Sequence, residues 1–150
     1  MSLSNIFAIS GSAMSAQTVR LNTVASNIAN ADSVASSVDQ TYRARKPVFE
    51  QMLTQEMRER GWNAQGGVME NASGMGVRVT GIIESDAPLQ PRYEPDSPMA
   101  NEEGYVFYPN VNPVEEMADM MSASRSFQTN VEIMNSAKSM MQRMLTLGQS

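Results

Sequence analysis

The feature that most constrains this chain is a heptad repeat in its last third, over residues 114–147. Alternating steps of three and four residues put mostly apolar side chains on one narrow helix face. That face comprises Met120, Ala123, Phe127, Asn130, Met134, Ala137, Met141 and Met144. No glycine or proline interrupts the segment, and a helix of this length extends roughly 50 Å. A helix so long, with so narrow an apolar face, requires another long helix beside it.

Residues 1–31 repeat the same spacing and provide that second helix. Their face comprises Phe7, Ser10, Met14, Gln17, Leu21, Val24, Ile28 and Ala31. We therefore predict a mainly α fold in which long N- and C-terminal helices pair as a coiled-coil hairpin. Three segments form one structural unit: a helix over residues 1–31, a loop and small β-rich insert over 32–113, and a helix over 114–150. Asn112 is the expected cap of the C-terminal helix.

A basic segment opens the insert. Residues 41–49 alternate basic and apolar side chains, which favours an extended strand. Arg43, Arg45 and Lys46 carry the positive charge of this strand. Two interpretations remain open: a basic contact for an acidic neighbour, or a solvated edge strand whose charges discourage pairing.

The rest of the insert is predicted from short local patterns. Residues 50–60 favour a short helix that glycines end, and residues 76–84 favour a strand with a bulge or turn at Gly81. Four prolines make residues 87–98 an extended connection without strand pairing in its middle. Residues 105–108 favour a further short strand.

Composition excludes several classes of protein. The chain has no cysteine and no histidine, which excludes disulfides, thiolate chemistry, ordinary zinc sites and the usual general base. The net charge of −5 argues against non-specific nucleic-acid binding. No cleavable secretion signal is visible, because the first basic residue is Arg20, and no stretch is apolar enough to span a membrane. The sequence assigns no role to Trp62, the single tryptophan.

No catalytic residues and no cofactor site emerge from the residue types. The one candidate for cation binding is the acidic group Glu102, Glu103, Glu115 and Glu116, which lacks the alternating oxygen ligands of a calcium loop. We expect a solvated acidic face there. The chain is therefore predicted to be a non-enzyme without cofactor or metal, and a small metal-dependent enzyme that uses the acidic segment is kept as an alternative.

Several segments resemble known proteins. Residues 26–32, SNIANAD, resemble the N-terminal signature shared by bacterial flagellar rod and hook proteins. The insertion of residues 33–39 departs from the shorter pattern of hook and distal-rod members and favours the proximal-rod members of this family. The segments similar to those proximal-rod members are TYRAR (41–45), PVF (47–49), GYV (104–106), PNVN (109–112), VEEM (114–117) and residues 122–149.

The resemblance implies a structural subunit of the rod in the flagellar basal body, which spans the periplasm as a helical drive shaft. Such axial proteins are made in the cytoplasm and exported by the flagellar type III pathway without a cleaved signal peptide. Expected partners are copies of this chain, other rod proteins, the inner-membrane ring and export gate at the rod base, and the export apparatus. Nucleic acid and lipid insertion are not expected.

We expect the subunit interface on the two terminal helices. The candidate interface residues are Phe7, Met14, Leu21, Val24, Ile28, Asn30, Met120, Phe127, Val131, Met134, Met141 and Met144. Polar interruptions at Ser10, Gln17 and Asn130 are expected to set the register of the helix pair. The alternative function is a soluble helical adaptor that recognises amphipathic helices, in which the apolar residues complete a self-contained bundle.

Overall fold

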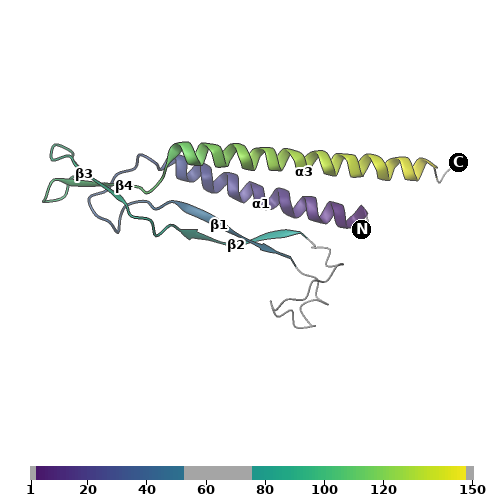
Figure 1. Cartoon of the computed structure of the whole chain (residues 1–150), viewed down its shortest axis with the longest axis horizontal. Coiled ribbons are helices and arrows are strands. Elements are labelled where there is room, and N and C mark those ends of the chain that lie inside the picture. The colour runs from purple at the N-terminus through teal and green to yellow at the C-terminus, as the bar shows by residue number, and fades with distance from the viewer. Residues whose placement is uncertain (1–2, 53–75, 148–150) are drawn as a thin grey trace, which may run out of the picture.

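Two long helices and four short strands make up the part of the chain that the structure, a computed structural model, describes: residues 3–52 and 76–147. In chain order the elements are α1 (Leu3–Ala29), β1 (Arg45–Gln51), β2 (Val77–Glu84), β3 (Gln90–Tyr93), β4 (Tyr105–Tyr108) and α3 (Pro113–Leu147). The strands form two separate two-stranded antiparallel sheets (Figure 1). The prediction of two long terminal helices with a small β-rich insert is confirmed.

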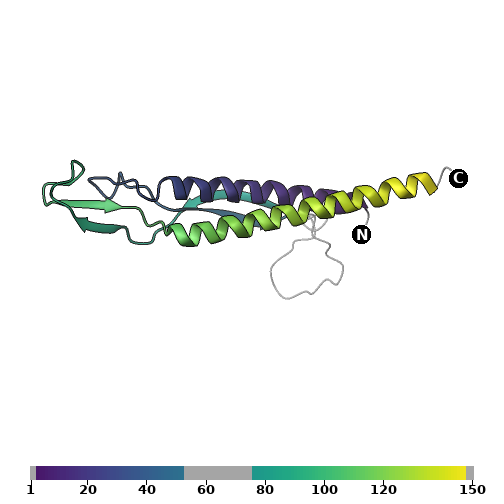
Figure 2. The ribbon, with the colours of Figure 1, turned by 90° about the horizontal axis from the view of Figure 1, so that it is seen from above.

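The two helices lie side by side and run in opposite directions (Figures 1 and 2). α3 continues past the start of α1 in both views, so its last turns have no part of α1 beside them. Asn112 caps α3 as predicted, because its Oδ1 accepts a 3.1 Å hydrogen bond from Val114 N. α1 ends two residues before the predicted position, where the Asn30 side chain bonds back to Ser26 O at 2.8 Å.

Small side chains fill the contact between α1 and α3. On the heptad faces, Ala123 and Ala137 are almost fully buried, as is the polar Ser10. Alanine lets helix backbones approach closely, but each buried methyl group stabilises the pair by only roughly 0.8 kcal/mol. The helix pair therefore depends on its length and on polar contacts more than on any large core residue.

β1 and β2 form a hairpin that lies along α1. The register shifts between Val48 and Phe49, where Val48 pairs with Gly81 and Phe49 pairs with Val79. This shift confirms the predicted irregularity at Gly81. Val77 N donates a 3.1 Å hydrogen bond to Ser12 Oγ, which fastens the start of β2 to α1. The hairpin is thereby positioned on the helix pair from one side.

Two predictions for the insert need correction. β1 begins at Arg45 rather than residue 41, and Glu50 and Gln51 continue this strand instead of opening a helix. The rest of the predicted helix over residues 50–60, like Trp62, lies outside the described residues. Residues 90–93 form β3 although they belong to the proline-rich segment predicted not to pair, because Pro91 lies in an edge strand, where its missing N–H is tolerated.

A second small core joins the insert to the helices where α1 ends and α3 begins. Val106 in β4 is completely buried, and Ala35, Ala44 and Val111 are nearly so. Ala35 and Phe107 exchange backbone hydrogen bonds of 3.1 and 2.9 Å. This core holds the β3–β4 arm at the end of the molecule opposite the end of α3 (Figure 1).

Candidate assembly interface

The predicted interface residues divide into three groups by exposure. Val24 is buried inside the subunit, so it contributes to the helix pair. Met141 and Met144 are exposed. The rest are partly exposed: Phe7, Met14, Leu21, Ile28, Asn30, Met120, Phe127, Val131 and Met134. Of these candidates, Met144 is covered least by the subunit itself, with 64% exposure, whereas Met141 is 38% exposed.

The last turns of α3 carry the most exposed of these apolar side chains. We call residues 138–147 the overhang, because they follow Ala137, which is still buried against α1. Met144 and Leu145 in the overhang are each 64% exposed, and Met140 and Met141 are also exposed. The overhang thus prolongs the apolar face of the helix pair beyond the end of its intramolecular partner.

A second exposed apolar row was absent from the sequence prediction. Val114, Met117 and Met121, here called the outer patch, lie on α3 with exposures of 75%, 52% and 61%. Steps of three and four residues connect them, so they occupy one stripe of the helix. A search of the sequence for a second heptad face would have found this patch.

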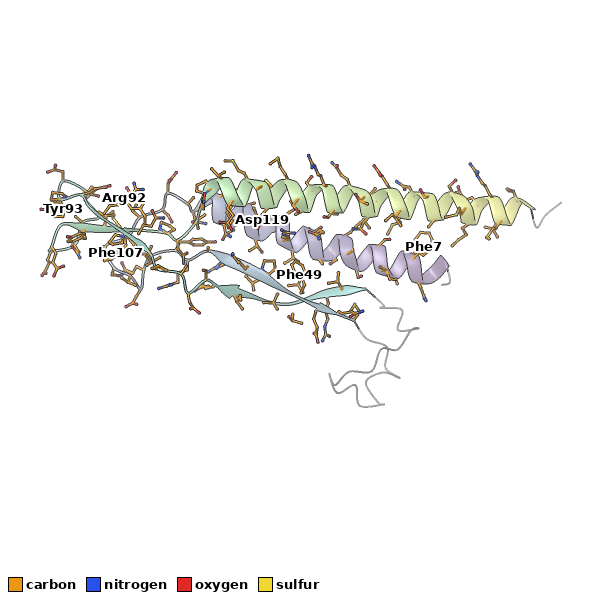
Figure 3. All side chains as sticks on the ribbon, viewed as in Figure 1. Phe7, Phe49, Arg92, Tyr93, Phe107 and Asp119 are labelled. Atoms are coloured by element: carbon orange, nitrogen blue, oxygen red, sulfur yellow. The ribbon has the colours of Figure 1, made fainter. Side chains whose placement is uncertain are left out.

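The β1–β2 hairpin adds a third apolar surface, which sequence reasoning also missed. Ile82 and Ile83 are more than half exposed, and Phe49 projects from β1 toward α1 (Figure 3). An open groove of about 280 Å³ lies between α1 and the hairpin and is lined by Val19, Asn22, Thr23, Ser26, Arg45 and Ile82. The hairpin therefore does not close completely over the helix.

A buried polar network lies where α1 ends and α3 begins. Asn27 in α1 is 1% exposed and makes four hydrogen bonds. Its Nδ2 donates to Arg45 O at 2.9 Å and to Glu116 Oε1 at 3.0 Å. Its Oδ1 accepts from Arg45 N and from the Tyr42 hydroxyl, both at 2.9 Å. One side chain therefore joins α1, the chain entering β1, and α3.

Glu116 is the acidic member of this network. It is 7% exposed, and burial is the main cause that raises its pKa above the ordinary value for a glutamate. The negative charges of Asp119 and Glu115 raise the pKa further, whereas the Asn27 hydrogen bond and the charge of Lys46 lower it. The free-energy cost of removing this carboxylate from water is therefore larger than the stabilisation that Asn27 and Lys46 give to its charged form.

The predicted basic segment has mostly intramolecular partners. Arg43 donates a 3.2 Å hydrogen bond to Ser85 O. Arg45 pairs with Glu84 across the β1–β2 hairpin at 3.2 Å, and both side chains are about half exposed. Lys46 is exposed on β1. The geometry is that of a solvated strand with its own ion pair, and Lys46 is the member of the trio most open to a neighbour.

The acidic residues do not converge on a cation site in the described part of the chain. No group of three or more His, Cys, Asp or Glu side chains there could hold a metal ion. Glu116, one of the four acids singled out in the sequence, is instead hydrogen-bonded to Asn27. Among the described residues, neither helix combines the length and the apolar character that crossing a membrane requires.

Two family models match the ends of the chain. The model described as flagella basal body rod protein matches residues 7–35, which include most of α1. The model described as flagellar basal body rod FlgEFG protein C-terminal matches residues 102–147, which include β4 and α3. Both long helices therefore carry sequence patterns of rod proteins.

Curated relatives extend the match to the whole chain. The flagellar basal-body rod protein FlgC of Escherichia coli O6:H1 is 51% identical over 149 residues, 99% of this chain and 100% of the relative. FlgC of Salmonella typhimurium is 50% identical over the same 149 residues. FlgC of Bacillus subtilis is 38% identical over 144 residues, 93% of this chain and 94% of the relative.

These matches identify a class of structural proteins, the flagellar basal-body rod proteins, which are not enzymes. Within this class, the chain belongs to the FlgC family. The resemblance seen in the sequence is confirmed, and with it the prediction of a structural subunit without catalytic activity.

Proposed function

We propose that this chain is a subunit of the proximal part of the flagellar rod, which polymerises into the drive shaft that transmits torque from the motor ring to the distal rod and hook. The single observation that carries this proposal is the exposed apolar surface on α3 of a rod-family chain. The overhang and the outer patch together expose several large apolar side chains on one helix. Such rows on a water-facing helix mark a protein–protein contact.

The two terminal helices form the axial part of this proposed assembly. In our proposal they pair as a coiled coil within the subunit, and residues 32–113 contact other subunits from the side. The partly exposed candidate residues on α1 and α3 complete the interface from both sides of the pair. Methionine suits such a surface, because its flexible side chain packs against neighbours that are not identical.

The positions of the two exposed rows favour an open assembly. The outer patch lies at the start of α3 and the overhang at its end, so they are different surfaces of one subunit. A contact between different surfaces is heterologous, and it generates a helix when the rotation between subunits does not close a ring. This symmetry argument supports a helical rod.

The partners and the route of this subunit follow from the same proposal. Copies of this chain and other rod proteins surround it in the basal body, and the inner-membrane ring and export gate adjoin the rod base. The subunit reaches this place from the cytoplasm through the flagellar export apparatus, without a cleaved signal peptide. Lys46, exposed on β1, is the residue of the basic segment proposed to meet an acidic neighbour.

The proposal is tested with single charges at the exposed rows. Met121→Asp and Met144→Asp are each introduced into a strain that lacks its own copy of the gene. Both side chains are more than half exposed in the subunit, so neither change should prevent folding, which circular dichroism of the purified variants checks. We expect normal expression, loss of rods from basal-body preparations and loss of swimming in soft agar, because each interface would bury an unpaired charge.

Ser122→Asp and Gln142→Asp are the matched controls, because both residues are exposed and polar, and each directly follows a methionine of the exposed rows on α3 at a position that faces another direction. They should leave swimming close to normal. Normal swimming in both methionine variants would contradict the assembly interface. It would favour the alternative of a helical adaptor, for which a charge on these rows need not affect the rod.

A further inference from the structure

We infer that Asn27 is a conformational lock, whose side-chain amide selects one register of the α1–α3 pair and fixes the β1–β2 hairpin to that register. The inference concerns how the subunit reaches a single shape, and it holds whether or not the proposed interfaces are correct. It rests on the burial of Asn27 and on the four hydrogen bonds that its side chain makes to three residues: Tyr42, Arg45 and Glu116.

The apolar contact between the helices specifies register weakly. Its most buried members are alanines, and both helices repeat their small and apolar residues every seven positions. A slip of one heptad moves one helix by roughly 10 Å along the other and again brings small and apolar side chains together. Polar contacts between the helices must therefore distinguish the native register, and the described residues show two: the Arg20–Asp119 ion pair at 2.8 Å and the buried Asn27–Glu116 hydrogen bond at 3.0 Å. The ion pair discriminates more weakly, because its partly exposed charges are solvated by water when they separate.

Two of the three polar residues that the heptad pattern favours for this purpose, Gln17 and Asn130, do not connect the helices through hydrogen bonds among the described residues. Asn130 Nδ2 donates to Ser126 O within α3 itself at 2.7 Å. Gln17 Oε1 is buried, and among the described residues it accepts no hydrogen bond. A slipped register would leave the bond of Asn130 intact and would cost Gln17 nothing. Neither residue can discriminate between registers in this way.

Asn27 can discriminate, because its hydrogen-bonding capacity is fully used in the native register. Two donors and two acceptor positions meet four partners, which is the full capacity of one amide side chain. A slip of one heptad would carry Glu116 out of reach and leave buried polar groups without partners, which is strongly unfavourable. A single buried asparagine is known to fix register in helix pairs for this reason.

The same side chain also positions the hairpin. Asn27 bonds to both the N–H and the C=O of Arg45, the first residue of β1. The Tyr42 hydroxyl lies 3.3 Å from Ser26 Oγ as well, so the approach to β1 is tied to α1 at consecutive residues. A change of register between α1 and α3 would therefore also disturb the position of the hairpin, because Asn27 bonds to both.

The test measures register directly in the purified full-length chain. Because the chain has no cysteine, spin labels can be attached at Asn22→Cys in α1 and Ser139→Cys in α3, both exposed positions. Asn27 faces Glu116, so in the antiparallel pair Asn22 lies beside residue 121, and Ser139 lies 18 residues (139 − 121) beyond that point. The separation of the labels, roughly 27 Å along the helix axis, therefore changes directly with register. Double electron–electron resonance should give one narrow distance distribution for the labelled chain.

Asn27→Leu in the labelled chain should add a second population displaced by roughly 10 Å, the length of one heptad slip. Asn30→Leu is the matched control, because Asn30 directly follows α1 and, among the described residues, its side chain bonds to Ser26 O in that helix and to neither α3 nor β1. The control should keep the single distance. An unchanged distribution for Asn27→Leu, or a broad distribution for the labelled chain before this change, would overturn the inference.

A second pair of variants covers the case in which Asn27→Leu does not fold. Asn27→Asp opposes a carboxylate to Glu116, and Glu116→Gln in the same chain restores a donor between the two positions. We expect a second distance population for Asn27→Asp and its partial loss in the double variant. Loss of the helical circular-dichroism signal in every Asn27 variant would also overturn the inference, because Asn27 would then support folding as a whole rather than the choice of register.

Discussion

Two amide side chains on α1 hold a buried oxygen, with opposite results. Asn27 makes four hydrogen bonds, whereas the buried Oε1 of Gln17 accepts none among the described residues. A buried acceptor without a partner costs roughly 1–3 kcal/mol, because it loses its hydrogen bonds to water. The two residues therefore act on the subunit in different ways: Asn27 gives it specificity, and Gln17 reduces its stability.

Replacement of Gln17 should stabilise the isolated subunit. Gln17→Met removes the unpaired oxygen and keeps a side chain of similar length, so we expect the free energy of unfolding to rise by about 1 kcal/mol. Urea denaturation followed by circular dichroism measures the change. Gln128→Met, at an exposed position of α3, is the control and should change stability by less than about 0.5 kcal/mol. A loss of stability in Gln17→Met would contradict the prediction.

Glu116 should make stability depend on pH. Its pKa in the folded chain lies above the ordinary value of 4.5, so the folded state holds this proton more tightly than the unfolded state. The contribution of Glu116 to stability is therefore largest at acid pH and is lost as the pH rises from 4.5 through the raised pKa. Glu116→Gln cannot titrate and keeps an acceptor for Asn27. We expect it to show a flatter stability profile between pH 4.5 and 7 in urea titrations.

The control for this measurement is Glu115→Gln, an exposed acid at the adjacent position. It should keep most of the pH dependence of the original chain. A profile of Glu116→Gln that matches the original chain would show that another group dominates this range.

At the scale of the elements, glycine has opposite effects in α1 and in the β3–β4 arm. Gly104 has a φ of +80°, and a Cβ there would lie 2.8 Å from Tyr93 Cε2. Gly11 lies inside α1, and a Cβ there would meet nothing within 4 Å. The first glycine is required by the turn before β4, whereas the second only lowers the stability of its helix.

Alanine at these two positions should therefore change stability in opposite directions. We expect Gly104→Ala to weaken the β3–β4 arm by roughly 1–3 kcal/mol and Gly11→Ala to stabilise α1 by roughly 0.5–1 kcal/mol. Amide hydrogen exchange, read separately over residues 90–108 and over α1, measures both effects. Faster exchange in α1 of Gly11→Ala, or unchanged exchange in the arm of Gly104→Ala, would contradict the argument.

Both long helices could be predicted from the sequence because heptad spacing and the cap at Asn112 are local signals that agree with the tertiary contacts. β3 could not. Pro91 argues against a strand, and only the presence of β4 on one side, with solvent on the other, makes pairing possible. Glu50 and Gln51 likewise favour a helix by local propensity, although pairing with β2 extends them as a strand.

At the scale of the whole molecule, the overhang sets the end of α3 apart from the rest of the helix. Residues 114–137 face α1, whereas residues 138–147 follow the last buried alanine. Amide exchange in the purified subunit should therefore be faster over 138–147 than over 114–137, because a helix end without tertiary packing opens more readily. In isolated basal bodies the difference should disappear. Equal exchange along α3 in the free subunit would contradict this prediction.

The candidate interface was predictable only in part. The heptad face indicated Met141 and Met144, which the structure leaves exposed, but it also indicated Val24, which the subunit buries itself. The sequence of one helix does not show where the helix beside it ends. The overhang could therefore be recognised only from the structure. The outer patch is not part of the heptad face that the prediction used for α3, which begins at Met120 on another side of the helix. The exposure of Ile82 depends on how the short hairpin docks on α1, which its sequence does not specify.

The antiparallel arrangement has a practical consequence for microscopy. The start of α1 and the end of α3 point the same way, whereas the turn between β3 and β4 lies at the opposite end (Figure 1). Peptide epitopes at these two places would label the two poles of one subunit. Gold-tagged antibodies against each epitope, applied to partly disassembled basal bodies, would then reveal which pole points toward the cell exterior, and so give the polarity of the subunit in the shaft.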